Sequence, residues 1–177
     1  MNPDAVSKQL CLACGLCCNG VLFKDVKLTS TDDLGLLKAA GLSLRSLPGK
    51  AAIPQPCSGL CADNRCRVYD HRPNRCQAFE CALFKAVAGD GVRLRSALQT
   101  VGTARRQVDK VRRLLRINGD SNEATPLSLR FRKLHFRFER SETDAEAVAS
   151  FGRLTLAMHA LNVILSTHFY PGSATED

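Results

Sequence analysis

The 177-residue sequence has no run near the ~18 consecutive apolar residues that a membrane span needs. Its first residues lack the basic segment and the apolar segment of a secretory signal. We therefore expect a cytoplasmic protein with no membrane partner. In that reducing compartment long-lived disulfides are rare. Paired carboxylates, a nucleophile with its base and a phosphate-binding loop are also missing, so no catalytic residue is predicted and no enzyme class is assigned.

Cysteine is absent from the last 96 residues, because all nine cysteines lie within the first 81. They are Cys11, Cys14, Cys17, Cys18, Cys57, Cys61, Cys66, Cys76 and Cys81. This segregation predicts a cysteine-cluster metal-binding module over residues 1–85 and a basic helical region over residues 86–177 that packs on it. The two parts can equally form one continuous domain.

Charge is also distributed unevenly along the chain, whose formal net charge is +8. Residues 91–140 carry 13 basic and 4 acidic side chains, so this segment supplies more than the whole excess. Such a segment could bind nucleic acid through phosphate neutralisation. No named nucleic-acid motif accompanies the charge, so we favour a solvated helix face whose arginines balance the charge of metal-bound thiolates.

The first cysteine cluster places four thiols within eight residues. Cys11, Cys14 and Cys17 make two successive Cys-x2-Cys steps, a spacing that brings sulfurs to one metal ion. Three thiolates at this spacing also match the loops that present three corners of an iron–sulfur cubane. Adjacent side chains diverge, so Cys18 serves a second ion or another edge of a cluster. Buried structural thiols and a disulfide scaffold explain this density less well.

The cysteine pattern resembles the CxxCxxCC (YkgJ-like) family. The resemblance rests on Cys-x2-Cys-x2-Cys-Cys at residues 11–18, Cys-x-x-Leu at residues 57–60, and a segment at residues 66–81 that includes Tyr69, Arg72, Pro73 and Phe79. That family is described as a zinc- or iron-chelating domain, and a flagellin lysine N-methylase contains a similar domain. The resemblance ends near residue 84, so methylase activity is not carried over to this chain.

The resemblance implies a set of eight metal ligands. These are Cys11, Cys14, Cys17, Cys18, Cys57, Cys66, Cys76 and Cys81. Cys61 falls outside the pattern and is expected to be a bystander, while His71 is a less favoured substitute ligand. Pro73 would stiffen the chain ahead of Cys76, and Arg72 would offset thiolate charge from beside the ligands.

Periodicity predicts a mainly α fold with minor β structure, in which a loop-rich cysteine module packs with C-terminal helices. We expect a glycine-punctuated turn at residues 11–20, a short extended segment at 21–23, a loop at 47–56 and a loop-rich segment with short turns at 57–81. An extended segment with a bulge is expected at 127–140.

A short helix is expected near residues 34–40, with N-cap residues at 29–33 and Gly41 as its stop. A second helix is expected from about 96 to 118, with one apolar stripe made of Val101, Ala104, Val108, Val111 and Leu115. A final helix, capped by residues 141–144, is expected to run until Pro171 and Gly172 stop it.

Three function classes follow from these features. The favoured one is a protein that holds iron or an iron–sulfur cluster, with a redox or enzymatic role left open. The alternative is a zinc-stapled binding module whose basic face engages nucleic acid or an acidic partner. The third is a metal carrier with exchangeable ions. The protein partner and the oligomeric state are not predicted.

Overall fold

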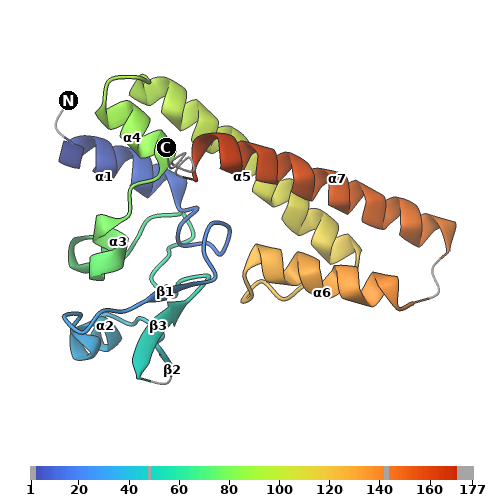
Figure 1. Ribbon diagram of the computed structural model, residues 1–177, viewed down its shortest axis with the longest axis horizontal. Coiled ribbons are helices and arrows are strands. Elements are labelled where there is room, and N and C mark those ends of the chain that lie inside the picture. The colour runs from blue at the N-terminus through green and yellow to red at the C-terminus, as the bar shows by residue number, and fades with distance from the viewer. Residues whose placement is uncertain (1–2, 48, 142–143, 171–177) are drawn as a thin grey trace, which may run out of the picture.

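A computed structural model describes residues 3–47, 49–141 and 144–170. The predicted mainly α fold with minor β structure is confirmed (Figure 1). In chain order the elements are α1 (Pro3–Cys14), β1 (Asp25–Lys27), α2 (Leu34–Ala39), β2 (Arg45–Leu47), β3 (Lys50–Pro54), a 3-10 turn (Tyr69–His71), α3 (Asn74–Ala78), α4 (Ala82–Ala88), α5 (Leu94–Ile117), α6 (Leu127–Glu139) and α7 (Ala145–His168).

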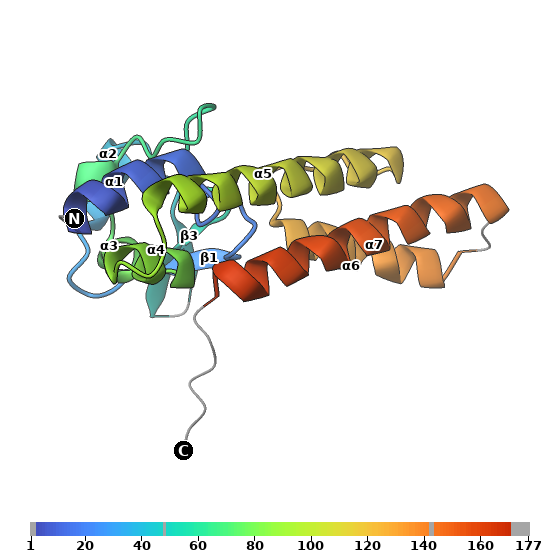
Figure 2. The same ribbon diagram turned by 90° about the horizontal axis from the view of Figure 1, so that it is seen from above.

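The elements divide between a cysteine-rich end and an extended helical part. An antiparallel sheet of order β1-β3-β2 lies at the cysteine-rich end with α2 and α3 beside it (Figure 1). The long helices α5 and α7 run side by side away from that end, and α6 accompanies their far halves (Figure 2). Helices α1 and α4 pack against the near half of α5 and so connect the two parts.

The apolar stripe predicted for the first long helix forms its buried face. Val101, Ala104, Val108, Val111 and Leu115 of α5 are all buried. They belong to the larger of two cores, which also takes in residues of α1, α4, α6 and α7. The spacing of three and four residues therefore identified the packed face correctly.

The predicted helix caps of α2 and α7 are confirmed. The carboxylate of Asp33 accepts a hydrogen bond from the amide of Leu36 at 2.9 Å, and that of Asp144 accepts one from Ala147 at 2.8 Å. Gly41 follows α2 with a φ of 80° and ends it as expected. The stop expected at Pro171 and Gly172 lies outside the described residues.

The prediction of an extended segment at residues 127–140 is wrong, because this segment forms helix α6. Its sequence fits both an alternating and a helical pattern, and tertiary packing decides between them. Leu127, Arg130 and Leu134 lie on one buried face at helical spacing. On the neighbouring face Phe138 stacks on Phe151 of α7 with ring centroids 4.4 Å apart.

Three local predictions in the cysteine-rich part also need correction. The segment 47–56, expected to be a loop, contains β3 and the end of β2, which pair across a turn at Gly49 with a φ of 66°. The extended segment lies at Asp25–Lys27 rather than at residues 21–23. Cys11 and Cys14 lie in the last turns of α1, so only the part of the first cluster after Cys14 is a turn.

Helix α7 is long and apolar enough, by length and composition, to cross a membrane, with a mean hydropathy of 1.4. Its buried residues instead form one stripe that includes Leu154, Leu161 and Leu165 and packs against α5. The expectation of no membrane partner stays a prediction.

A smaller second core joins the sheet to α2 and to the loops beside it. It consists of five buried residues among those described: Leu28, Leu37, Leu42, Ile53 and Val68. Cys57 and Cys66 pack against this cluster, whereas Cys14, Cys17 and Cys81 pack against the larger core. The cysteines therefore lie where the two cores meet.

Candidate metal centre

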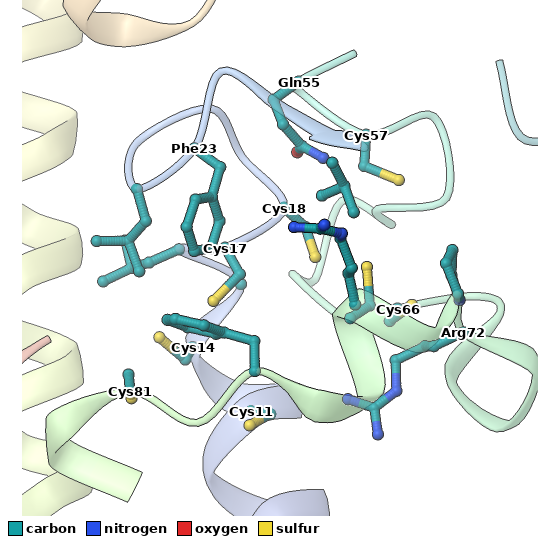
Figure 3. A pocket seen from close by; sticks show the side chains of 18 of the residues that line it. Cys11, Cys14, Cys17, Cys18, Phe23, Gln55, Cys57, Cys66, Arg72 and Cys81 are labelled. Carbon is teal, nitrogen blue, oxygen red and sulfur yellow. The ribbon is translucent and has the colours of Figure 1, made fainter. Parts of the chain in front are cut away.

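The eight predicted ligands line one cavity of about 520 Å³ (Figure 3). Its walls also carry apolar side chains from both cores, among them Leu22, Ile53 and Phe169. Cys61 and His71 are exposed and do not line this cavity. The fold thus brings together thiols that are up to 70 residues apart in sequence.

The first three thiols are positioned by the end of α1 and the turn that follows it. Cys11 and Cys14 are three residues apart in the helix and so share one face. Gly15 then adopts a φ of 67°, and its carbonyl accepts a hydrogen bond from the amide of Cys18 at 3.0 Å. A side chain at Gly15 would also collide with Asn64, so only glycine makes this turn without strain.

Backbone amides point at several of the sulfurs. The amide of Gly59 donates to the Cys57 sulfur at 3.3 Å, and the amide of Phe84 donates to the Cys81 sulfur at 3.4 Å. Cys81 is also the N-cap of α4, where the helix dipole favours negative charge. These donors stabilise a thiolate over a thiol, which is what a metal ligand requires.

Cys76 is placed by a hydrogen-bond network that sequence reasoning missed. It lies in the short helix α3, whose first residue Asn74 donates its backbone amide to the Asp32 carboxylate at 2.8 Å. The same carboxylate accepts the amide of Thr29 at 2.7 Å, so it ties α3 to the segment after β1. From the sequence Asp32 is only a candidate for the cap of α2, because a contact across 42 residues leaves no local signal.

Two arginines from different parts of the chain lie near the thiols of the cavity. The Arg72 guanidinium lies 3.9 Å from the centroid of the Tyr69 ring, near Cys66 and Cys76. From α5, Arg105 donates to the Ala13 carbonyl at 3.1 Å, next to Cys14. Part of the basic middle segment therefore faces the thiols rather than the solvent.

Comparison with known families gives one match. A family model described as "Putative zinc- or iron-chelating domain", CxxCxxCC, matches residues 10–103, which is more than half of the chain. The chain belongs to the CxxCxxCC family. No curated protein and no solved structure matches it significantly. The match extends past the cysteines to residue 103, so it includes α4 and the first turns of α5.

The residues present fit the metals named for the CxxCxxCC family. Sulfur ligands suit both zinc and iron, and the cavity offers eight of them. Across the described residues, no three Cys, His, Asp or Glu side chains already surround a common point closely enough to hold an ion. Binding therefore requires the thiols to rotate about their side-chain bonds.

The environment of Gln55 also indicates that this cavity binds a polar or charged group. Its side chain is 3% exposed, and its Oε1 is the buried side-chain atom without a hydrogen-bond partner in the described part of the chain. Figure 3 shows the side chain entering the cavity near Cys18 and Cys57. Buried acceptors without partners are rare, so this oxygen fits a centre that brings a donor or a cation with it.

Burial keeps the thiols neutral in the absence of a metal. Burial, together with the neighbouring thiols, raises the pKa of both Cys14 and Cys76 to about 12. Burial also raises the pKa of Cys17 and Cys18 well above the ordinary value of 9.0. A bound cation must therefore displace a proton from each thiol that it recruits.

Metal affinity is consequently expected to rise with pH. Each neutral thiol that ionises on binding adds one to the slope of log affinity against pH, so a four-thiol site should show a slope of about four below pH ~9. A competition titration with a chromophoric chelator between pH ~6 and ~9 measures this slope. Cys61→Ser should leave it unchanged, and an affinity independent of pH would contradict thiol ligation.

The metal-free chain should show the opposite trend in stability. For a thiol whose folded pKa lies above its unfolded value of 9.0, the stabilisation is present below pH 9. For Cys14, which lies on α1 and packs against the larger core, it is lost as pH rises toward the folded pKa of about 12. The free energy of unfolding of the metal-free chain should therefore fall above pH 9.

Proposed function

We propose that this protein holds iron, as ions or as an iron–sulfur cluster, through eight cysteine thiolates. The proposal is carried by one observation: the cavity is lined by the eight cysteines that the family pattern implies and not by the ninth. An iron–sulfur cluster bound there would supply one-electron redox chemistry. We further propose a cytoplasmic location, since nine cysteines suit a compartment where thiols stay reduced.

The arrangement at the end of α1 supports iron. Cys11, Cys14 and Cys17 have the spacing of a loop that provides three cysteine ligands to an iron–sulfur cluster. Cys81 lies near them at the start of α4. A cluster with four cysteine ligands commonly takes three from such a loop and the fourth from elsewhere in the chain.

The chain's own residues would tune such a centre. Amide donors to sulfur and nearby guanidinium groups favour the added negative charge of a reduced state. Arg72 and Arg105 lie near the thiols from two different elements. The apolar wall of the cavity would limit access of water. It includes Phe23 and Phe79, whose rings meet edge to face with centroids 4.8 Å apart.

A zinc-stapled binding module is the second candidate. It is supported by the exposed basic side chains of α5 and α6, such as Lys110, Arg113 and Lys133, which do not line the cavity. In this reading the metal holds the cysteine-rich end together and the extended helices meet nucleic acid or an acidic protein. Binding would then weaken steeply with added salt.

Metal analysis separates the two candidates. Protein purified without oxygen is expected to be brown, with a broad band near ~400 nm and with iron and acid-labile sulfide in comparable amounts. Cys61→Ser should keep the same metal content and spectrum. Colourless protein that contains zinc in stoichiometric amounts would overturn the iron proposal while leaving a thiolate site in place.

A further inference from the structure

We infer that the eight cysteines form two separate four-thiolate sites, and that the chain crosses from one to the other between Cys17 and Cys18. The first site consists of Cys11, Cys14, Cys17 and Cys81. The second consists of Cys18, Cys57, Cys66 and Cys76. This inference rests on the proposed function in requiring that the thiols bind metal, but it does not depend on which metal.

The members of the first site belong to the helical side of the molecule. Cys11 and Cys14 lie on α1, and α1 packs against α4, whose N-cap is Cys81. Cys14, Cys17 and Cys81 all pack against the larger core. Two helix ends and one turn therefore present these sulfurs from a single packed unit.

The members of the second site belong to the sheet side. The amide of Cys57 donates a hydrogen bond to the carbonyl of Cys18 at 2.7 Å, so the two loop segments that carry these cysteines are joined here. Cys66 forms an isolated β-bridge with Leu60 and, like Cys57, packs against the smaller core. Cys76 comes from α3, which contacts β1.

The side chains of the two adjacent cysteines face different neighbours. Figure 3 shows the sulfur of Cys17 on the side of Cys14 and the sulfur of Cys18 turned toward Cys66. The interactions between thiols divide in the same way. Those that act on Cys18 come first from Cys57, Cys66 and Cys76, and those on Cys14 come from Cys81 and Cys11. Across the boundary, Cys18 also acts on Cys17, and Cys14 acts on Cys18 more weakly than the thiols of its own set.

Each proposed site also has its own guanidinium group. Arg105 of α5 acts on Cys14 and is held by the Ala13 carbonyl. Arg72 acts on Cys66 and Cys76 and is held by the Tyr69 carbonyl at 3.0 Å. Four thiolates around a divalent ion carry a net charge of −2, so a separate cation beside each set lowers the cost of burying two such centres.

Substitution of the two neighbours provides a sharp test. In Cys17→Ser and in Cys18→Ser we expect a partial loss of metal, with the two losses adding up to the wild-type content. The double variant Cys17→Ser/Cys18→Ser should lose all of it, whereas Cys14→Ser/Cys17→Ser should lose no more than Cys17→Ser alone. Complete loss in either single variant, with circular dichroism showing a retained fold, would overturn the inference in favour of one shared centre.

A substitution outside the ligand set covers the case in which a cysteine variant unfolds. Asp32→Ala removes the hydrogen bond that holds α3, and α3 carries only Cys76 of the eight ligands. A chelator should therefore extract the metal of the second site about 10–100 times faster than from the wild type. The remaining metal should leave at the wild-type rate. Asp33→Ala, which removes only the cap of α2, is the matched control. An equal increase in the extraction rate of all the metal would overturn the division into two sites.

These outcomes are distinct from failure of the proposed function. If purified wild-type protein contains zinc in place of iron, the proposed function fails while the same substitutions still test the division. If it binds neither metal after reconstitution with Zn²⁺ or Fe²⁺ under reducing conditions, both proposals fail.

Discussion

Removal of the metal by a chelator is expected to unfold the sheet side of the molecule while α5, α6 and α7 remain folded. The smaller core has only five buried residues among those described, and the segments around it are short strands and loops. A core of this size rarely stabilises a fold without a disulfide or a metal. Metal binding in such modules supplies on the order of 10 kcal/mol, which is also their folding free energy.

Hydrogen exchange followed by mass spectrometry measures this effect for each segment. After chelation, amides in β1, β3 and α3 should exchange at nearly the unprotected rate, a change of several orders of magnitude. Amides in the centres of α5 and α7 should change little, because their packing belongs to the larger core. Equal loss of protection in all segments would show instead that the metal supports the whole molecule as a single cooperative unit.

Replacement of Arg130 by methionine is expected to lower the free energy of unfolding by about 3–5 kcal/mol. The Arg130 guanidinium donates to the Asp120 carboxylate at 2.9 Å and to the Asp120 carbonyl at 3.0 Å. The side chains of Arg130 and Asp120 are 2% and 9% exposed. The variant would therefore leave a carboxylate buried without its charge partner.

Two controls identify the cause of this loss. Arg132→Met changes an exposed arginine of the same helix and should alter the free energy of unfolding by less than ~0.5 kcal/mol. The double variant Asp120→Ala/Arg130→Met removes the unpaired carboxylate and should cost less than the sum of the single changes. Denaturant unfolding measures the wild type, Arg130→Met, Arg132→Met, Asp120→Ala and the double variant. Strict additivity would show that the pair contributes nothing beyond packing.

Helix boundaries and the packed face of α5 were predictable from sequence because their signals are local. Asp33 and Asp144 each cap a helix through an amide three residues away. Gly41 ends a helix through its own backbone conformation. The apolar stripe of α5 repeats over several turns, so one pattern dominates its sequence.

The α6 segment was not predictable in this way. Its apolar residues fit both a strand and a helix, and the choice depends on Phe131 and Phe138 packing against Phe151 from the next helix. The pairing of β2 with β3 depends likewise on the sheet formed with β1, while prolines and a glycine made the same residues look like a loop.

The sequence by itself indicated which residues of this protein are candidate metal ligands. The chain shows directly that nine cysteines have a spacing typical of metal ligands. It also shows a segment, residues 91–140, in which 13 basic residues face only 4 acidic ones. The family pattern further singled out Cys61 as a bystander, and this thiol is indeed exposed and outside the cavity.

Only the tertiary structure decided how those thiols are grouped and what supports them. Spacing along the chain suggests which cysteines are neighbours in a turn, but Cys17 and Cys18 face different partners because α4 closes on one side and the Cys57 loop on the other. The Asp32 contact with α3 and the orphaned Gln55 oxygen likewise arise between distant segments. Such contacts depend on the three-dimensional packing of two cores, which no local pattern encodes.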